Sequence, residues 1–327
     1  MIKMRRLIQF IKDWTLPVSI VTGSFLYLVF AFIPALESAA TVFAPILDAA
    51  LPLFMFLVLY VTFCKVDFRK LIPVGWHLWI ALSQVLMVAV VIGVILTFHV
   101  TGETLILLEA LLTCIICPCA SAAAVVTQKL GGDLEEMTTY TFLSNFLCAL
   151  LIPVCFPLLD AGAGLTFWSA FVMILYKVCL VLVVPMLLAY ITKHWHALCR
   201  FYQWVISVDN LSYYLWACSL LIVSGTTVKN IVHAEVAVSF LLLIAVLALI
   251  LCLIQFVIGR YIGHFFRSTI NAGQALGQKN TAFAIWIAYT YLNPLSTVGP
   301  GCYILWQNII NSVEIWRHDH AIKRINE

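Results

Sequence analysis

Charged residues are scarce in this chain. Of its 327 residues, 18 are Lys or Arg and 15 are Asp or Glu, together 10%, whereas 64% are hydrophobic. Soluble domains carry about 25% charged and about 45–50% apolar residues. The composition therefore excludes an ordinary soluble domain. Long apolar runs recur along the whole chain and predict an all-α, polytopic membrane protein embedded in a lipid bilayer.

Motifs of enzymatic and metal chemistry are also missing from the sequence. It contains no Ser/His/Asp set and no phosphate-binding loop. The 11 cysteines lie almost all inside apolar segments at irregular spacing, as small membrane-core residues do rather than a disulfide framework. The "CPC" at 117–119 has no second Cys or His pair at metal-ligand spacing. We therefore expect no enzyme, no cofactor, no resident metal and no nucleic-acid partner.

Apolar runs long enough to cross a membrane occur ten times. A helix needs about 20 such residues to span the hydrocarbon core, and loops with turn signals separate the runs. The predicted spans are 15–34, 41–63, 75–98, 104–128, 136–159, 165–192, 203–226, 234–259, 269–292 and 298–316.

The basic residues orient these spans. Almost all Lys and Arg side chains fall on one side; only Lys229 falls on the other, and Lys177 and Lys279 lie within spans. By the positive-inside rule, both termini are cytoplasmic in an inner (cytoplasmic) membrane. The start, "MIKMRRLIQFIKDW", is basic and amphipathic with no small-residue cleavage site, so we expect no cleaved signal peptide.

Five predicted spans lie on each side of the loop "DAGAG". An odd number forces the second half to enter the membrane from the opposite side, so residues 1–162 and 163–327 are predicted to be inverted five-helix repeats. The fourth span of each half is interrupted: Pro118 lies within "CPCASAAA", and Gly277 precedes the polar run 278–281. Paired breaks indicate a transporter binding site, where free N–H groups of half-helices suit an anion. The alternative is two kinked helices packed through small residues.

The residues around these breaks resemble the bile acid:sodium symporter family. The segments "CPCASAAAVVTQKLGGDLEEMTTYTFLSNFLCALLIPVCFPLL" and "LGQKNTAFAIWIAYTYLNPLSTVGPGCYILWQNIINSVEIW" are similar to its helices four and five and nine and ten, and "ALSQVLM" to part of helix three. The resemblance implies ten transmembrane helices, with broken helices four and nine crossing. Helices one, two, six and seven would form a panel domain, and helices three to five and eight to ten a core domain. It also implies alternating access and sodium-coupled uptake of organic anions, such as bile acids or small carboxylates.

Most sodium ligands that the resemblance implies are replaced here. The Ser-Asn pair, one Ser and the bridging Glu have become alanines or methionine, and Lys279 stands where the family has a Gln. An ammonium 4 Å from a cation costs on the order of 4 kcal/mol at an effective dielectric of 20. We therefore expect transport that sodium does not drive. The former sodium-site positions are Gln84, Ala123, Ala124, Met137, Thr141 and Ala275.

Lys279 has three possible roles. Its charge can replace sodium permanently, or burial can let the amine cycle a proton. In a protein that does not transport, the ammonium can be structural, bonded to backbone carbonyls of the broken helix. A lysine at the bilayer centre costs about 2.5–3.5 kcal/mol on insertion scales, and it usually faces the interior of the helix bundle.

Several polar residues in the spans complete the predicted site. The resemblance implies that they line the substrate site; ordinary interhelical hydrogen bonding is an equal alternative. These candidates are Ser121, Asn280, Thr281, Gln307 and Asn308. The sequence thus predicts a secondary active transporter of an organic anion. The alternatives are a non-transporting membrane receptor or sensor, and a proton-coupled or uncoupled facilitator. The sequence carries no prediction of the oligomeric state.

Overall fold

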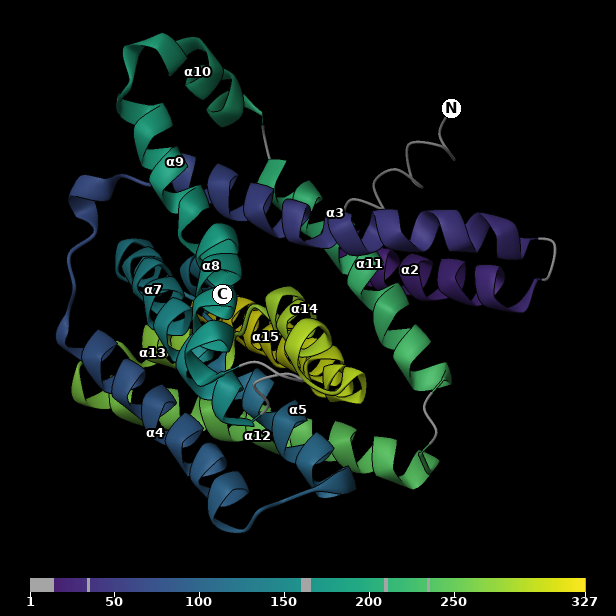
Figure 1. The fold of residues 1–327 in the computed structure, drawn as a ribbon. Coiled ribbons are helices and arrows are strands. Elements are labelled where there is room, and N and C mark those ends of the chain that lie inside the picture. The colour runs from purple at the N-terminus through teal and green to yellow at the C-terminus, as the bar shows by residue number, and fades with distance from the viewer. Residues whose placement is uncertain (1–14, 34–35, 160–165, 209–210, 234–235, 327) are drawn as a thin grey trace.

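The chain folds into helices joined by short connections (Figure 1). The computed structural model describes residues 15–33, 36–159, 166–208, 211–233 and 236–326. Within these ranges there is one isolated β-bridge and no strand, which confirms the all-α prediction. The N-terminal basic residues that contribute to the predicted orientation lie outside the described residues.

The helices follow one another in this order. They are α2 (Thr15–Phe32), α3 (Glu37–Cys64), η2 (Phe68–Lys70), α4 (Gly75–Thr97), α5 (Gly102–Ile116), α6 (Ala123–Lys129), α7 (Leu134–Leu159), α8 (Phe167–Leu182), α9 (Val184–His194), η3 (His196–Leu198), α10 (Cys199–Ser207), α11 (Leu211–Val232), α12 (Val238–Phe265), α13 (Thr269–Gly277), α14 (Thr281–Tyr291), η4 (Pro294–Thr297) and α15 (Val298–Asn326).

Six stretches of the described residues are long and apolar enough to cross a membrane. They are Pro45–Cys64, Gly75–Thr97, Leu134–Leu159, Phe167–His194, Tyr214–Val232 and Val238–Phe265. A shorter apolar helix runs over Val18–Phe32. The half-helices α5, α6, α13 and α14 are each shorter than the roughly 20 residues of a full span. The protein is thus a multi-pass membrane protein, and the count of ten spans stays a prediction.

The span predicted at 203–226 begins later than expected. The structure ends α10 at Ser207 and starts α11 at Leu211, so the apolar span is Tyr214–Val232 and residues 203–207 belong to a separate short helix. The helix does not continue because Val208, which follows α10, is in an extended conformation with φ −78° and ψ 110°. The span predicted at 165–192 is divided at Val183 into α8 and α9. Pro185, two residues later, has no N–H to donate to the helical hydrogen bonds.

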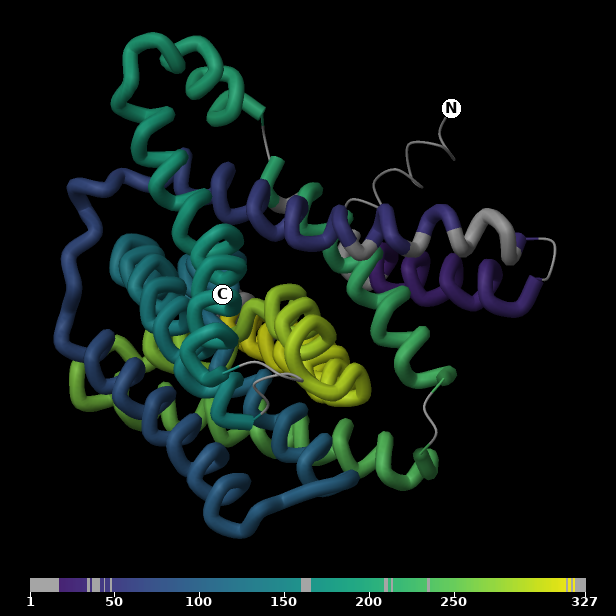
Figure 2. Tube along the Cα trace, in the orientation of Figure 1, coloured from purple at the N-terminus to yellow at the C-terminus, as the bar shows by residue number. Residues whose placement is uncertain are grey.

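The helices form two groups that meet around the half-helices. α11 packs along α2 and α3, the group at the upper right of Figures 1 and 2. α12 packs along α13 and α15 in the second group. α8 contacts α7 and α9 contacts α3, so this pair joins both groups. The largest buried apolar cluster unites them and includes Leu59, Ile116, Ile152, Val178 and Phe283.

Candidate functional site

Both predicted breaks are present in the structure. α5 ends at Ile116 and the chain resumes as α6 at Ala123; α13 ends at Gly277 and α14 begins at Thr281. Cys117 leaves the first half-helix in an extended conformation, with φ −69° and ψ 152°. Pro118 causes this exit, because the residue before a proline is pushed out of the helical region.

The two breaks pair with each other as a short antiparallel bridge. The N–H of Ala120 donates to the carbonyl of Gln278 at 3.0 Å, and the N–H of Asn280 donates to the carbonyl of Pro118 at 2.9 Å. Two such bonds enclose a directly opposed residue pair between them. Segments about 160 residues apart in the sequence are thereby held at one point, and the broken helices cross there.

The opposed pair is Cys119 and Lys279, and side chains bond both of their backbone N–H groups and the carbonyl of Lys279. The Cys119 N–H donates to Ser144 Oγ at 3.2 Å. The Lys279 N–H donates to Gln307 Oε1 at 2.9 Å, and Gln307 Nε2 donates to the Lys279 carbonyl at 3.2 Å. Non-helical backbone at membrane depth needs such partners, because lipid offers none.

The ammonium of Lys279 lies inside the protein at the end of α5. The residue is 1% exposed. Its Nζ donates to the carbonyls of Ile115 at 3.0 Å and Cys117 at 3.3 Å, and no ion pair to it occurs among the described residues. The last carbonyls of a helix lack partners within it, and the negative end of the helix dipole favours a cation there. Lys279 is therefore a cationic cap on the first half-helix.

Gln84 of α4 caps the same end. Its Nε2 lies 3.0 Å from the carbonyl oxygen of Ile115, 3.1 Å from that of Ile116 and 3.1 Å from that of Cys117. The amide therefore presents its nitrogen, not its oxygen, to the break. The retained glutamine stabilises a carbonyl cluster together with Lys279.

The second half-helix has a cap that the sequence analysis missed. Tyr303 of α15 donates its hydroxyl to the carbonyl of Gly277 at 2.8 Å and accepts a hydrogen bond from Gln255 Nε2 at 3.0 Å. Both residues are buried. The only sequence signal is a polar group inside an otherwise apolar span, which shows that a partner is needed but not which one.

Four of the positions that the resemblance equates with a sodium site come together in the fold. Ala123, Ala124, Met137 and Ala275 belong to one buried apolar cluster. The neighbouring Thr141 donates its hydroxyl to the Met137 carbonyl at 3.0 Å. None of the four clustered side chains carries an oxygen, so this pocket packs as a core. The described residues also contain no group of three or more His, Cys, Asp or Glu side chains that could hold a metal ion.

A small cavity adjoins the crossing. Its volume is about 20 Å³, and its lining includes Ser121, Lys279, Asn280 and Thr281 from the breaks and Ser219 from α11. That is room for about one water molecule. Asn280 also caps α14, because its Oδ1 accepts from the N–H of Phe283 at 3.2 Å. The N-terminus of α14, which is the positive end of the helix dipole, therefore forms part of this cavity's wall.

A much larger cavity of about 1310 Å³ lies between the two helix groups. α2, α3 and α11 line one side, and α6, α7 and α15 the other, with Ser121, Gln278 and Thr141 near the crossing. Among the candidate ligands on α15, Asn308 lines this cavity. Gln307 instead bonds the backbone of Lys279. The structure thus brings the candidate residues together around the crossing. Ser121, Asn280, Thr281 and Asn308 line the two cavities, and Gln307 bonds the backbone of Lys279.

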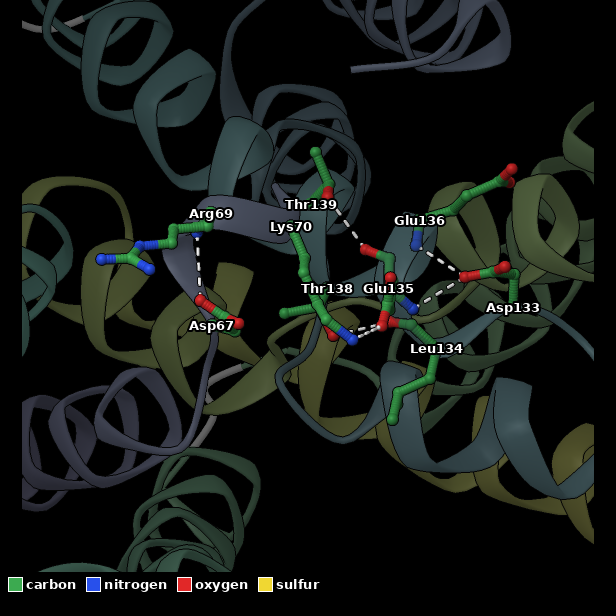
Figure 3. Close-up of polar contacts among 9 residues, drawn as sticks. All are labelled: Asp67, Arg69, Lys70, Asp133, Leu134, Glu135, Glu136, Thr138 and Thr139. Carbon is green, nitrogen blue, oxygen red and sulfur yellow. Dashed lines mark hydrogen bonds and ion pairs between the residues drawn. The ribbon is translucent and has the colours of Figure 1, made fainter. Parts of the chain in front are cut away.

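Charged residues after α3 and at the start of α7 help to line the large cavity, and Figure 3 shows the polar contacts in this region. The described lining of this cavity holds three lysines against two acids, and Lys70 forms an ion pair with Glu135. The hydrogen bond with Glu135 is the main cause that raises the pKa of Lys70 above its usual 10.5. The N-terminus of α7 is fixed by Asp133, whose Oδ1 accepts from the N–H groups of Glu135 and Glu136 at 2.8 and 2.9 Å.

This architecture defines a class: a multi-pass helical membrane protein with two broken helices that cross beside a large cavity. Comparison with protein-family models gives a match. The model of the Sodium Bile acid symporter family matches residues 52–234, more than half of the chain, and the chain belongs to this family of transporters. A comparison with curated proteins gives no match. The matched residues include the first break and Gln84, whereas Lys279 lies beyond them.

Proposed function

We propose that this protein is a secondary transporter of an organic anion, and that Lys279 takes the place of a coupling sodium ion. The proposal includes ten spans in two inverted repeats, 1–162 and 163–327, with cytoplasmic termini in the inner membrane. Panel helices one, two, six and seven would move against core helices three to five and eight to ten in alternating access. The observation that carries the proposal is the buried ammonium of Lys279 on the carbonyls of Ile115 and Cys117.

Three features argue against sodium at this crossing. The carbonyl oxygens at the end of α5 are hard ligands suited to a cation, but Lys279 and Gln84 already donate to them. The four clustered positions Ala123, Ala124, Met137 and Ala275 supply no side-chain oxygen. A second cation beside the ammonium would meet repulsion that a buried site screens poorly. A fixed charge that stabilises the crossing without dissociating therefore replaces an ion that binds and leaves.

The cavities suit an anionic amphipath. The end of α14 and the side chains of Ser121, Asn280 and Thr281 offer hydrogen-bonding groups and a positive dipole end to a carboxylate or sulfate. The large cavity offers room for an apolar body. The excess of lysines over acids in its lining attracts an anion. A bile-acid-like amphipath fits both parts, and a small carboxylate fits the first.

Uptake by proteoliposomes tests the proposal. Radiolabelled taurocholate and radiolabelled succinate serve as probes, with sodium on both sides replaced by choline. We expect uptake of at least one probe to continue at an unchanged initial rate in choline; a collapse of that uptake would overturn sodium independence. An imposed proton gradient distinguishes a proton-coupled carrier from a facilitator. Saturable binding without flux of either probe would assign the protein to the receptor alternative.

A further inference from the structure

A short helix outside the apolar spans presents aromatic and basic side chains to its surroundings. α10 lies between the spans Phe167–His194 and Tyr214–Val232 and projects away from the main body at the top of Figures 1 and 2. Val205 is buried and Tyr202 half-buried against the core. Phe201 and Trp204, by contrast, are 47% and 57% exposed, and their rings stack with centroids 5.9 Å apart.

The position of α10 is limited by its connection to the preceding span. Only residues 195–198 separate α10 from the end of α9 at His194. An extended chain reaches at most about 3.3–3.6 Å per residue, so α10, five residues beyond His194, begins within about 18 Å of the end of the span. The exposed rings of Trp195, Phe201 and Trp204 therefore lie near the end of the span, the level at which a crossing helix meets the membrane surface. Aromatic rings of this kind are enriched at that level, where one end is apolar and the other is wet.

The segment that contains α10 is basic, and the carboxylate of Asp67 is close enough to act on Tyr202 at the half-buried side of the helix. From Val184 to Val208 the sequence has no acidic residue. The ammonium of Lys193 is occupied, since it donates to the carbonyl of Val66 at 2.7 Å. Arg200 is exposed and has no ion pair among the described residues. An exposed guanidinium beside aromatic rings at a membrane surface is complementary to a lipid phosphate, which it can bind through two parallel hydrogen bonds.

We propose that the α10 surface, made of Trp195, Arg200, Phe201 and Trp204, binds the membrane with an anionic lipid headgroup on Arg200. The aromatic rings lie among the headgroups and the first acyl carbons, and the polar side with Gln203 faces water. Amphipathic helices with this division of side chains lie in the plane of the interface. The inference is independent of what the protein transports, because the α10 surface does not line either cavity.

Spin labels on neighbouring residues test the depth of the helix. The full chain, with the exposed Cys199 and Cys218 replaced by serine, carries either Trp204→Cys or Gln203→Cys and is placed in lipid nanodiscs. We expect the label at 204 to be relaxed preferentially by oxygen and the label at 203 by a water-soluble nickel chelate. A label at 204 that the nickel chelate reaches as readily as the one at 203 would overturn the proposal and favour a soluble acidic partner.

Retention of lipids tests the headgroup. The protein is taken from nanodiscs of equal phosphatidylglycerol and phosphatidylcholine, and retained lipids are counted by native mass spectrometry. A basic residue near the surface changes anionic lipid binding about fivefold. We therefore expect Arg200→Gln to lower the ratio of retained phosphatidylglycerol to phosphatidylcholine by about that factor, while Gln203→Ala, which removes an exposed neutral side chain of the same helix, leaves it unchanged. Equal ratios in the unaltered protein and both variants would contradict the proposal.

Discussion

Lys279 and Gln84 donate to the same two carbonyl oxygens, those of Ile115 and Cys117 at the end of α5. One donor comes from the break of the second interrupted helix, the other from α4. The carbonyl end of one half-helix is thus stabilised jointly by an amide and an ammonium. In a family named for sodium, this shared cap is the feature that most alters the expected mechanism.

Removing both shared donors should cost more than the two single changes suggest. Lys279→Met and Gln84→Leu each leave the other donor on the carbonyls, whereas the double variant leaves them buried without partners. An orphaned buried acceptor costs about 1–3 kcal/mol, and residues in one hydrogen-bond network couple by about 0.5–3 kcal/mol. Thermal unfolding in detergent of all four proteins measures the coupling. Strict additivity of the midpoint shifts would show that the two donors do not share a role.

Restoring oxygen ligands should create a response to sodium. In the variant Ala123→Ser, Ala124→Asn, Ala275→Glu and Lys279→Gln, the apolar cluster gains a carboxylate and loses the neighbouring ammonium. We expect sodium to raise its thermal midpoint relative to choline, because a ligand that binds the folded state stabilises it. The control retains Lys279 beside the other three substitutions and should respond less. A sodium shift already present in the unaltered protein would contradict the interpretation of Lys279.

The hydroxyl of Tyr303 should contribute to the stability of the folded protein. Tyr303→Phe retains the packing but leaves the Gly277 carbonyl and the Gln255 amide without this partner. We expect a loss of about 1–3 kcal/mol in the free energy of unfolding. Tyr176→Phe, at an exposed position, is the matched control and should be neutral. Chemical denaturation in detergent measures both, and equal stability of the two variants would exclude the proposed cap.

The ion pair between Lys70 and Glu135 should influence the rate of uptake through charge at the cavity. Both side chains are exposed, so Lys70→Glu should have little effect on stability, but it puts two acids where one pair stood. We expect slower uptake of an anionic probe by Lys70→Glu and recovery in the double variant Lys70→Glu, Glu135→Lys. Initial rates at low and high salt provide the measurement, because screening should reduce the difference. A double variant as slow as the single one would show that pairing is irrelevant.

The same pair should not produce a pH response near neutrality. Glu135 raises the pKa of Lys70 above 10.5, so the interaction is fully present below that pH and is lost only as pH rises through the higher folded-state value. The uptake profiles of the unaltered protein and Lys70→Gln between pH 6 and 8 should therefore be parallel. Profiles that diverge within this window would mean that Lys70 loses its proton at far lower pH than its partner implies.

The sequence alone was sufficient for the breaks but not for their partners. Pro118 and Gly277 interrupt the apolar helical pattern. Proline lacks a backbone N–H and glycine has a freer backbone, so these breaks follow from the local sequence and do not depend on the tertiary structure. Gln307 was predicted either to contact substrate or to make an ordinary interhelical hydrogen bond, and the structure places its amide on the backbone of Lys279. Ser144 and Tyr303 were missed because a hydroxyl inside an apolar span looks the same whether it bonds its own helix or a distant break.

The sequence by itself determined that this chain is a helical membrane protein with two interrupted helices and an interior lysine. Composition and the spacing of apolar residues are local properties of the sequence. In lipid, backbone polar groups must be satisfied within the protein, so few structures are compatible with an apolar sequence of this kind. Only the tertiary structure decided that the lysine caps the opposite half-helix and that Ala123, Ala124, Met137 and Ala275 pack into one apolar cluster. Those facts depend on contacts between residues more than one hundred positions apart, which neither hydropathy nor spacing encodes.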